Sequence, residues 1–232
     1  MRTRLIFASV VALSIPAVYG DNVTVNSGGS VTLLDSGFTS TDFTSPFSNA
    51  NFLAAETGTA ASIESSDPFY IASLPSGPGA VWIGTNTTAG ANVGDTALYA
   101  ISFNIPDAFS SASLNLFYAI DNELGGSNPG IYLNGIALPA STGIGGFSSQ
   151  FTYTDASVGG DLVQGTNWLF IDGVNLGGPA GLIFSANIST ANSVPEPSSA
   201  WLLAGLLIAG AVSWRLRKRV DAGLSRVIAT RD

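Results

Sequence analysis

A short run of polar residues in the middle of the chain has the side-chain types that bind sugar hydroxyls. Its members are Asp121, Asn122, Glu123, Asn128 and Asn134. Carboxylates and carboxamides can form paired hydrogen bonds to neighbouring hydroxyls. Trp82 or Tyr132 would supply an aromatic plate beneath the sugar ring. Turn chemistry is the alternative, because Asp and Asn hydrogen-bond their own backbone and tolerate left-handed conformations.

Carboxylates are also oxygen ligands for Ca²⁺. The candidate donors are Asp35, Asp42, Asp121, Asp155, Asp161 and Asp172. No D-x-D-x-D-G loop selects among them, so a structural Ca²⁺ and simple solvated charge both stay open, and no cofactor is required.

Two carboxylates could in principle hydrolyse a glycoside. Asp121 and Glu123 are two residues apart and would share one face of a strand. A hydrolase would also need a deep aromatic cleft, for which about 170 residues offer little material. We therefore expect a protein that is not an enzyme.

Charge excludes several other classes of function. Residues 21–199 carry 14 acidic residues and no Lys, Arg, His or Cys. A domain without cations cannot neutralise phosphates, so nucleic-acid binding is excluded for it. Without His or Cys there is no Ser-His or Cys-His nucleophile.

The candidate residues must be positioned by β-strands. Short apolar runs alternate with polar residues and are separated by Gly, Pro and Asn, which predicts an all-β sandwich or barrel. The Asn134-Gly135 pair predicts a tight hairpin, because both turn positions need positive φ. No sustained helical period occurs in the domain. The strands expected are 98–105, 114–120, 131–133, 136–138, 147–153, 168–174 and 182–188. In three of them alternation places one set of apolar residues on a single face: Ile101, Phe103 and Ile105, then Leu114, Leu116, Tyr118 and Ile120, then Leu182, Phe184, Ala186 and Ile188.

The two ends of the chain differ from this domain. Residues 1–20 combine Arg2 and Arg4 with an apolar stretch and small residues, which predicts a cleaved signal peptide rather than a membrane anchor. Near the other end, residues 200–214 are uncharged and would form a helix of about 22 Å. That is short against a hydrocarbon core of about 30 Å. The basic cluster after it places the C-terminus in the cytoplasm and argues against a buried core helix.

This C-terminal arrangement resembles the PEP-CTERM sorting signal of exported bacterial proteins, a segment also labelled as the C-terminal domain of ice-binding proteins. The residues that carry the resemblance are Pro195, Glu196, Pro197, Arg215, Arg217, Lys218 and Arg219, around a transmembrane helix at 200–214. The resemblance implies processing by exosortase, a transient inner-membrane anchor, and release to the cell surface or an exopolysaccharide or biofilm matrix. The sorting segment is 193–219. The tail 220–232 departs from the family, whose members stop soon after the basic cluster.

The domain expected at residues 21–192 in turn resembles galactose-binding-like jelly rolls, over most of residues 33–190. The matching fragments are Trp82–Gly84, Tyr118–Glu123, Tyr132–Gly135, Gly146-Phe147, Gly165–Phe170 and Gly177–Leu182. The resemblance implies a jelly-roll β-sandwich that binds sugars in many relatives and is purely structural in others. We therefore expect an exported, carbohydrate-associated protein. The alternatives are a matrix protein without a specific ligand and, less favoured, a secreted glycoside hydrolase.

Overall fold

Alternating apolar and polar residues form the longest strands of the protein. The computed structural model describes residues 20–35, 43, 45–65, 67–87 and 96–192, together with residues 205, 209, 210 and 213. The strands are β1 (Asn22–Asn26), β2 (Thr32–Asp35), β3 (Thr59–Ala60), β4 (Ser62–Ile63), β5 (Ile83–Gly84), β6 (Ala97–Ile105), β7 (Ser111–Leu124), β8 (Ile131–Leu133), β9 (Ile136–Ala137), β10 (Ile144–Asp155), β11 (Gly165–Val174) and β12 (Gly181–Ala191). The helices are α1 (Asn49–Glu56) and the short 3₁₀ helix η2 (Val158–Gly160).

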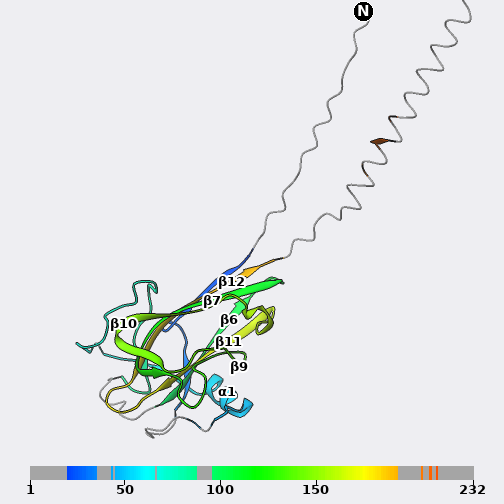
Figure 1. The fold of residues 1–232 in the computed structure, drawn as a ribbon. Helices are drawn as coiled ribbons and strands as arrows, with labels where there is room; N and C mark the ends of the chain where they lie inside the picture. Colours follow the sequence, from blue (N-terminus) through cyan, green and yellow to red (C-terminus); the bar gives the residue numbers. More distant parts are fainter. Residues whose placement is uncertain are drawn as a thin grey trace, which may run out of the picture. The chain divides into compact units, whose positions relative to one another are not determined.

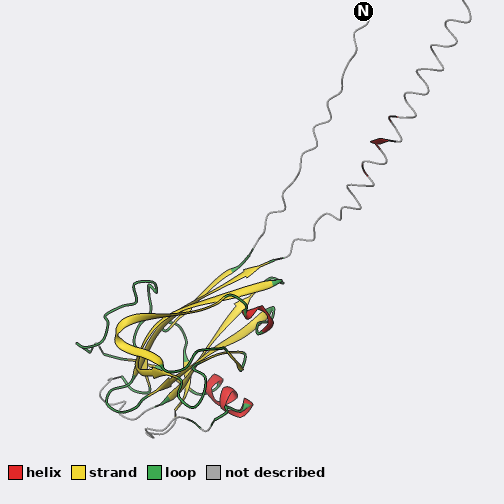
Figure 2. Ribbon diagram, viewed as in Figure 1, coloured by secondary structure: helices red, strands yellow, loops and turns green. Residues whose placement is uncertain are grey.

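The strands form two layers, and every strand pairing in the described residues is antiparallel. In the first layer, the β7 sheet, β7 lies between β10 and β12, and β12 also pairs with β1 and β5. The second layer, the β6 sheet, has the order β3-β2-β6-β11, with β8 and β9 beyond β11. The layers join where Gly173 and Val174 pair with Leu124 and Glu123. Strands are the main regular structure of the domain (Figures 1 and 2).

The core lies between the two sheets and is built from alternate residues of the long strands. Burying one Leu or Phe side chain contributes about 1.5–3 kcal/mol, so these strands dominate the stability. The inward residues expected from the sequence are all buried in this cluster. They are Ile101, Phe103, Ile105, Leu114, Leu116, Tyr118, Ile120, Leu182, Phe184, Ala186 and Ile188. The prediction of an all-β sandwich or barrel is confirmed.

The predicted hairpin at Asn134-Gly135 joins β8 and β9. The two residues have φ of 51° and 81°, in the left-handed region that this turn requires. The Asn134 side chain also accepts a hydrogen bond from the backbone amide of Trp168 at 2.8 Å. It donates to the Asn167 side chain at 2.9 Å. Asn134 therefore holds the turn against β11.

Both sheets also bury residues on their outer faces. Helix α1 covers the β6 sheet through Phe52 and Ala55, which pack with Tyr132 and Phe170. The loop 67–82 covers the β7 sheet. The sequence did not predict α1, because eight residues with two buried positions give no sustained period. Its start is marked by Asn51, whose side-chain oxygen accepts from the Ser48 amide at 2.9 Å.

Several predicted features lie outside the described residues. These are the signal peptide apart from residue 20, Asp42, the sorting residues 195–197 and 215–219, and the tail 220–232. Within the predicted transmembrane segment 200–214 only four residues are described, and they are helical. Among the described residues, no helix has the length and apolar character needed to cross a membrane.

Candidate functional site

The site begins on the outer face of β7. Strand alternation turns Phe117, Ala119 and Asp121 away from the core that Leu116, Tyr118 and Ile120 enter. Asp121 is the last of these three along β7. Its partner across the sheet is Gly181, the first residue of β12. The loop 67–82 crosses this face and packs Tyr70, Leu74 and Trp82 on Ala119 and Ile183. The apolar part of the face is therefore covered, and Tyr70, near the start of the covering loop, reaches the Asp121 carboxylate.

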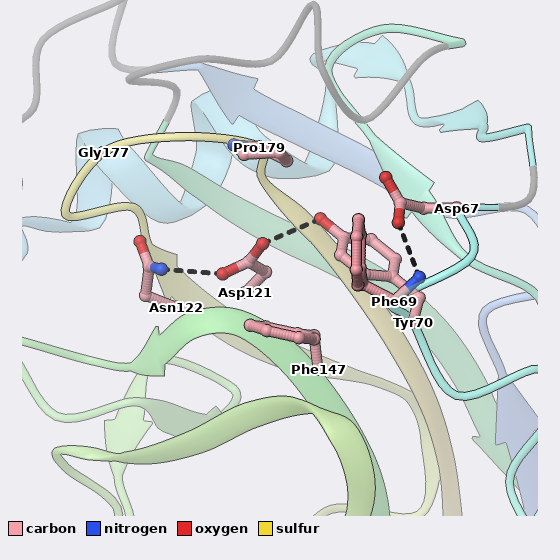
Figure 3. Close-up of a pocket in the computed structure, with 8 residues that line it drawn as sticks. All are labelled: Asp67, Phe69, Tyr70, Asp121, Asn122, Phe147, Gly177 and Pro179. Carbon is pink, nitrogen blue, oxygen red and sulfur yellow. Dashed lines mark hydrogen bonds between the residues drawn. The ribbon is translucent and has the colours of Figure 1, made fainter.

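A chain of hydrogen bonds connects the loop to β7 at this point (Figure 3). The Tyr70 hydroxyl donates to Asp121 Oδ2 at 2.9 Å. Asn122 Nδ2 donates to Asp121 Oδ1 at 2.7 Å, and the peptide bond between Asp121 and Asn122 is cis. Asn122 Oδ1 accepts from the Leu176 amide at 2.7 Å. Asp121 thus has a fixed donor on each oxygen, and each oxygen retains a further lone pair for a ligand.

Burial sets the protonation of the Tyr70–Asp121 pair. Desolvation raises the pKa of Asp121, which is only 6% exposed, and the charge of Asp67 adds to this rise. The hydrogen bond from Tyr70 acts in the opposite direction and lowers the Asp121 pKa. Burial, followed by the charge of Asp121, raises the pKa of Tyr70. The Tyr70 phenol therefore stays protonated and remains the donor.

The surface is hollowed beside this chain of hydrogen bonds. A pocket of about 340 Å³ is lined by Asp67, Phe69, Tyr70, Asp121, Asn122, Phe147, Gly177 and Pro179 (Figure 3). A second hollow of about 260 Å³ is lined by residues that include Asp67, Tyr70 and Trp82. The Phe69 and Phe147 side chains are 75% and 36% exposed, so aromatic surface borders the pocket.

Aromatic contacts hold Tyr70 in place between these hollows. Its ring centroid lies 4.3 Å from that of Trp82 and 5.7 Å from that of Phe147. Trp82 Nε1 donates to the Ile71 carbonyl at 2.7 Å, which fixes the indole. The Ile71 amide donates to the Phe147 carbonyl at 2.8 Å and ties the loop to β10. The pocket is thus preformed by packing and hydrogen bonds.

This arrangement suits a ligand that has both apolar and hydroxylated surfaces. Exposed aromatic groups can pack on C–H faces, while a buried carboxylate and a carboxamide can accept from or donate to hydroxyls. The second carboxylate of the hydrolase hypothesis, Glu123, does not line the pocket. It lies at the end of β7, where it pairs with Val174. Recognition of a ligand therefore fits this geometry better than hydrolysis by Asp121 and Glu123.

The structure brings only part of the sequence-predicted sugar site together. Asp121 and Asn122 line the pocket, and Trp82 lines the adjacent hollow. Tyr132, by contrast, packs in the cluster under α1. Asn128 is buried, and its amide donates to the Phe43 carbonyl at 3.2 Å. Asn134 holds the β8–β9 turn, as described above.

Six residues of the pocket were not among the site residues predicted from the sequence. They are Asp67, Phe69, Tyr70, Phe147, Gly177 and Pro179. The adjacent aromatic residues Phe69 and Tyr70 in a turn-rich segment were the available signal, since large aromatic side chains in loops often contact ligands. Nothing in the sequence links Tyr70 to Asp121, which is 51 residues away.

The candidate calcium ligands are dispersed in the described residues. No group of three or more Asp, Glu, His or Cys there is arranged to hold a metal ion. Asp155 accepts from the Ser157 amide at 2.9 Å, which is turn chemistry. Asp172 is fully buried in β11, and Asp121 is engaged by Tyr70 and Asn122. Of the remaining candidates, Asp35 ends β2 and Asp161 follows η2.

Comparison with known proteins confirms the C-terminal resemblance. Residues 193–218 match the PEP-CTERM protein-sorting motif. The motif indicates an exported protein of the kind that exosortase sorts. A search of curated proteins found no match.

One solved structure with some similarity is that of CBM35 from Paenibacillus barcinonensis. The two are 18% identical, and the alignment covers 74% of this chain and 99% of that one, with a TM-score of 0.33. This score does not establish a shared fold, so the sandwich assignment rests on the strand order and the core.

Proposed function

We propose that this is an exported, exosortase-sorted protein whose domain binds polysaccharide without cleaving it. The proposed binding site is the pocket formed by Tyr70, Asp121, Asn122, Phe69 and Phe147. The domain would be a jelly roll of the galactose-binding-like type, held at the inner membrane before processing. It would then lie at the cell surface or in the extracellular matrix.

One observation carries the binding proposal. The hydrogen-bonded set Tyr70–Asp121–Asn122 lies in a pocket bordered by the exposed aromatic rings of Phe69 and Phe147. Preorganised polar groups lose little entropy when they bind. Contact between an aromatic ring and an apolar sugar face buries apolar surface and so contributes favourable binding free energy. The pocket volume of about 340 Å³ is within the usual range for small-ligand sites.

Loss of pocket aromatic surface tests the proposal. We expect Phe69→Ala to weaken binding to oligosaccharides on a glycan array by about tenfold, a loss of about 1.4 kcal/mol. The control is Leu53→Ala, which removes another exposed apolar side chain, 59% exposed, from α1 on the other sheet. The full chain would be purified in a detergent without a sugar headgroup.

The outcomes of this experiment separate the three functional hypotheses. Binding that Phe69→Ala weakens and Leu53→Ala preserves supports the pocket. Absence of binding to every glycan would favour a matrix protein without a specific ligand. In a separate incubation of the protein with model polysaccharides, release of reducing ends would indicate a glycoside hydrolase and contradict the proposal.

The sorting part has its own test. Glu196 lies between Pro195 and Pro197 in the matched motif, which is the segment through which exosortase would recognise the chain. We expect Glu196→Ala to leave full-mass protein in the inner membrane of the native host. Asp221→Ala removes an acid beyond the basic cluster and is the control. A mutant that is processed and released like the parent would contradict exosortase sorting through Glu196.

A further inference from the structure

The charge of the pocket restricts the class of sugar that it can bind. Asp67 and Asp121 both line it. The two carboxylates interact, since the charge of Asp67 contributes to the raised pKa of Asp121. Asp67 Oδ1 accepts from the Phe69 amide at 2.8 Å, which places this carboxylate at the base of the exposed Phe69 ring. The pocket therefore has negative potential next to aromatic surface.

The domain offers no cation to offset this potential. Residues 21–192 contain no Lys, Arg or His. A uronate or sulfated sugar would bring a further negative charge beside Asp67 and Asp121 without a partner. Like charges at close range repel, and the repulsion grows where water is displaced.

A sugar with a protonated amine has a charge opposite to that of the pocket carboxylates, and it can also interact with the aromatic rings of the pocket. An ammonium group is attracted to carboxylates and also to the faces of aromatic rings. The ring centroids of Tyr70 and Phe147 lie 5.7 Å apart at this site, and Phe69 is exposed in the same pocket. Aromatic rings combined with carboxylates are the chemistry that recognises organic ammonium ions.

We propose that the pocket selects glycans whose sugar units carry a free, protonated amine and rejects glycans built from uronates. This inference rests on the proposed function and narrows it to one ligand class. Asp67 supplies the charge selectivity, and the exposed rings of Phe69 and Phe147 supply the surface on which the sugar packs.

A pair of ligands that differ by one charge on each sugar unit tests the selectivity. Glucosamine oligomers and N-acetylglucosamine oligomers of equal length share a backbone, but only the first has protonated amines. We expect the full chain, at mildly acidic pH, to bind the glucosamine oligomer about five- to tenfold more tightly in calorimetry. Galacturonate oligomers of the same length should show no binding. Added NaCl should reduce the preference by screening.

Matched variants separate a local effect from attraction to the overall negative charge of the domain. Asp67→Asn retains the oxygen that accepts from Phe69 but removes the charge, so it should abolish most of the preference. Asp107→Asn removes one exposed charge from the loop between β6 and β7. This loop precedes the start of β7, whereas Asp121 lies near its end, so the variant should leave the preference intact.

Three results would overturn the inference. They are equal or tighter binding of the acetylated oligomer, binding of galacturonate oligomers, and an equal loss of preference in both Asn variants. Tight binding of neutral oligomers that Phe69→Ala weakens would remove the charge selectivity and leave the proposed function standing. Absence of binding to all three ligands and to every glycan on the array would contradict both the charge selectivity and the proposed binding function.

Discussion

The sandwich carries an aromatic cluster on each outer face, and the two clusters differ in what surrounds the rings. In the closed cluster on the β6 sheet, Phe52 contacts Phe170 and Tyr132 at centroid distances of 4.8 and 5.0 Å. Helix α1 covers it. The open cluster on the β7 sheet contains Phe69, Tyr70 and Trp82 from the loop 67–82 and Phe147 from β10.

The difference shows that aromatic side chains alone do not make a binding site. In the closed cluster the rings pack against one another in tilted and edge-to-face arrangements, and Phe52 is only 7% exposed. In the open cluster the loop leaves Phe69 exposed, and the Asp121 carboxylate and the Asn122 carboxamide of β7 line the same pocket. Stability is thus the main role of the first cluster, whereas the second has free aromatic surface beside polar groups.

The largest expected effect separates these roles by truncation. Phe52→Ala should lower the free energy of unfolding by about 3–5 kcal/mol, because it leaves a cavity among buried rings. Phe69→Ala should change it by about 0.5 kcal/mol or less, because the side chain is already exposed. Urea unfolding of the two variants measures both values. Equal destabilisation would remove the distinction between the clusters.

The next effect concerns the polar half of the open cluster. Tyr70→Phe keeps the ring contacts with Trp82 and Phe147 but removes a donor to a buried carboxylate, which should cost about 1–3 kcal/mol. The Asp121 pKa should rise further, since the Tyr70 hydrogen bond lowers it. The control is Tyr153→Phe, because the Tyr153 hydroxyl donates to the exposed Pro139 carbonyl at 2.9 Å. A stable Tyr70→Phe with an unchanged Asp121 titration would contradict this assignment.

Sequence patterns predicted those parts of the fold that depend on local structure. Alternation placed Ile101, Phe103 and Ile105 in the core correctly, because burial of one strand face leaves a period of two in the chain. The Asn134-Gly135 hairpin followed from local backbone requirements. Strands β1 to β5 were not named, because four of them have two to four residues and β1, although it alternates, has only five.

The candidate site was harder to predict for a different reason. Asp121 and Asn122 were recognised at the end of a strong strand, but their partner Tyr70 belongs to a loop whose path depends on tertiary contacts. Tyr132 and Trp82 were equal candidates for an aromatic plate. Only the packing of α1 on one sheet face and of the loop 67–82 on the other separates them.

A smaller effect distinguishes the clusters by pH. Burial raises the native pKa of Asp121 above its ordinary value of 3.8, so the native state retains this proton at a higher pH than the unfolded state. The contribution of Asp121 to stability is therefore full below about pH 3.8 and is lost as the pH rises through the raised native pKa.

Thermal melts of the parent and Asp121→Asn check this sign. As the pH falls from neutral toward about pH 4, the parent should gain stability relative to the variant. A parent that loses stability relative to Asp121→Asn over the same range would show that hydrogen bonding to the ionised carboxylate outweighs desolvation.

The smallest effect comes from the charge that surrounds both clusters. Residues 21–199 carry 14 acidic and no basic residues, so screening by NaCl should raise the melting temperature by about 2–4 °C. At matched ionic strength, a specific calcium site would add a further rise with CaCl₂ that neither NaCl nor MgCl₂ gives. A melting temperature that falls or stays constant with NaCl would contradict the screening argument.

The central claim is that the open cluster is the site that binds a glycan. A crystal structure of the protein with a glucosamine oligomer tests it most directly. We predict a sugar ring against Phe69 or Phe147, with a hydroxyl or ammonium group within about 3 Å of Asp121, Asn122 or Asp67. A sugar bound on the α1 face or anywhere else, with the pocket beside Tyr70 empty, would contradict the account.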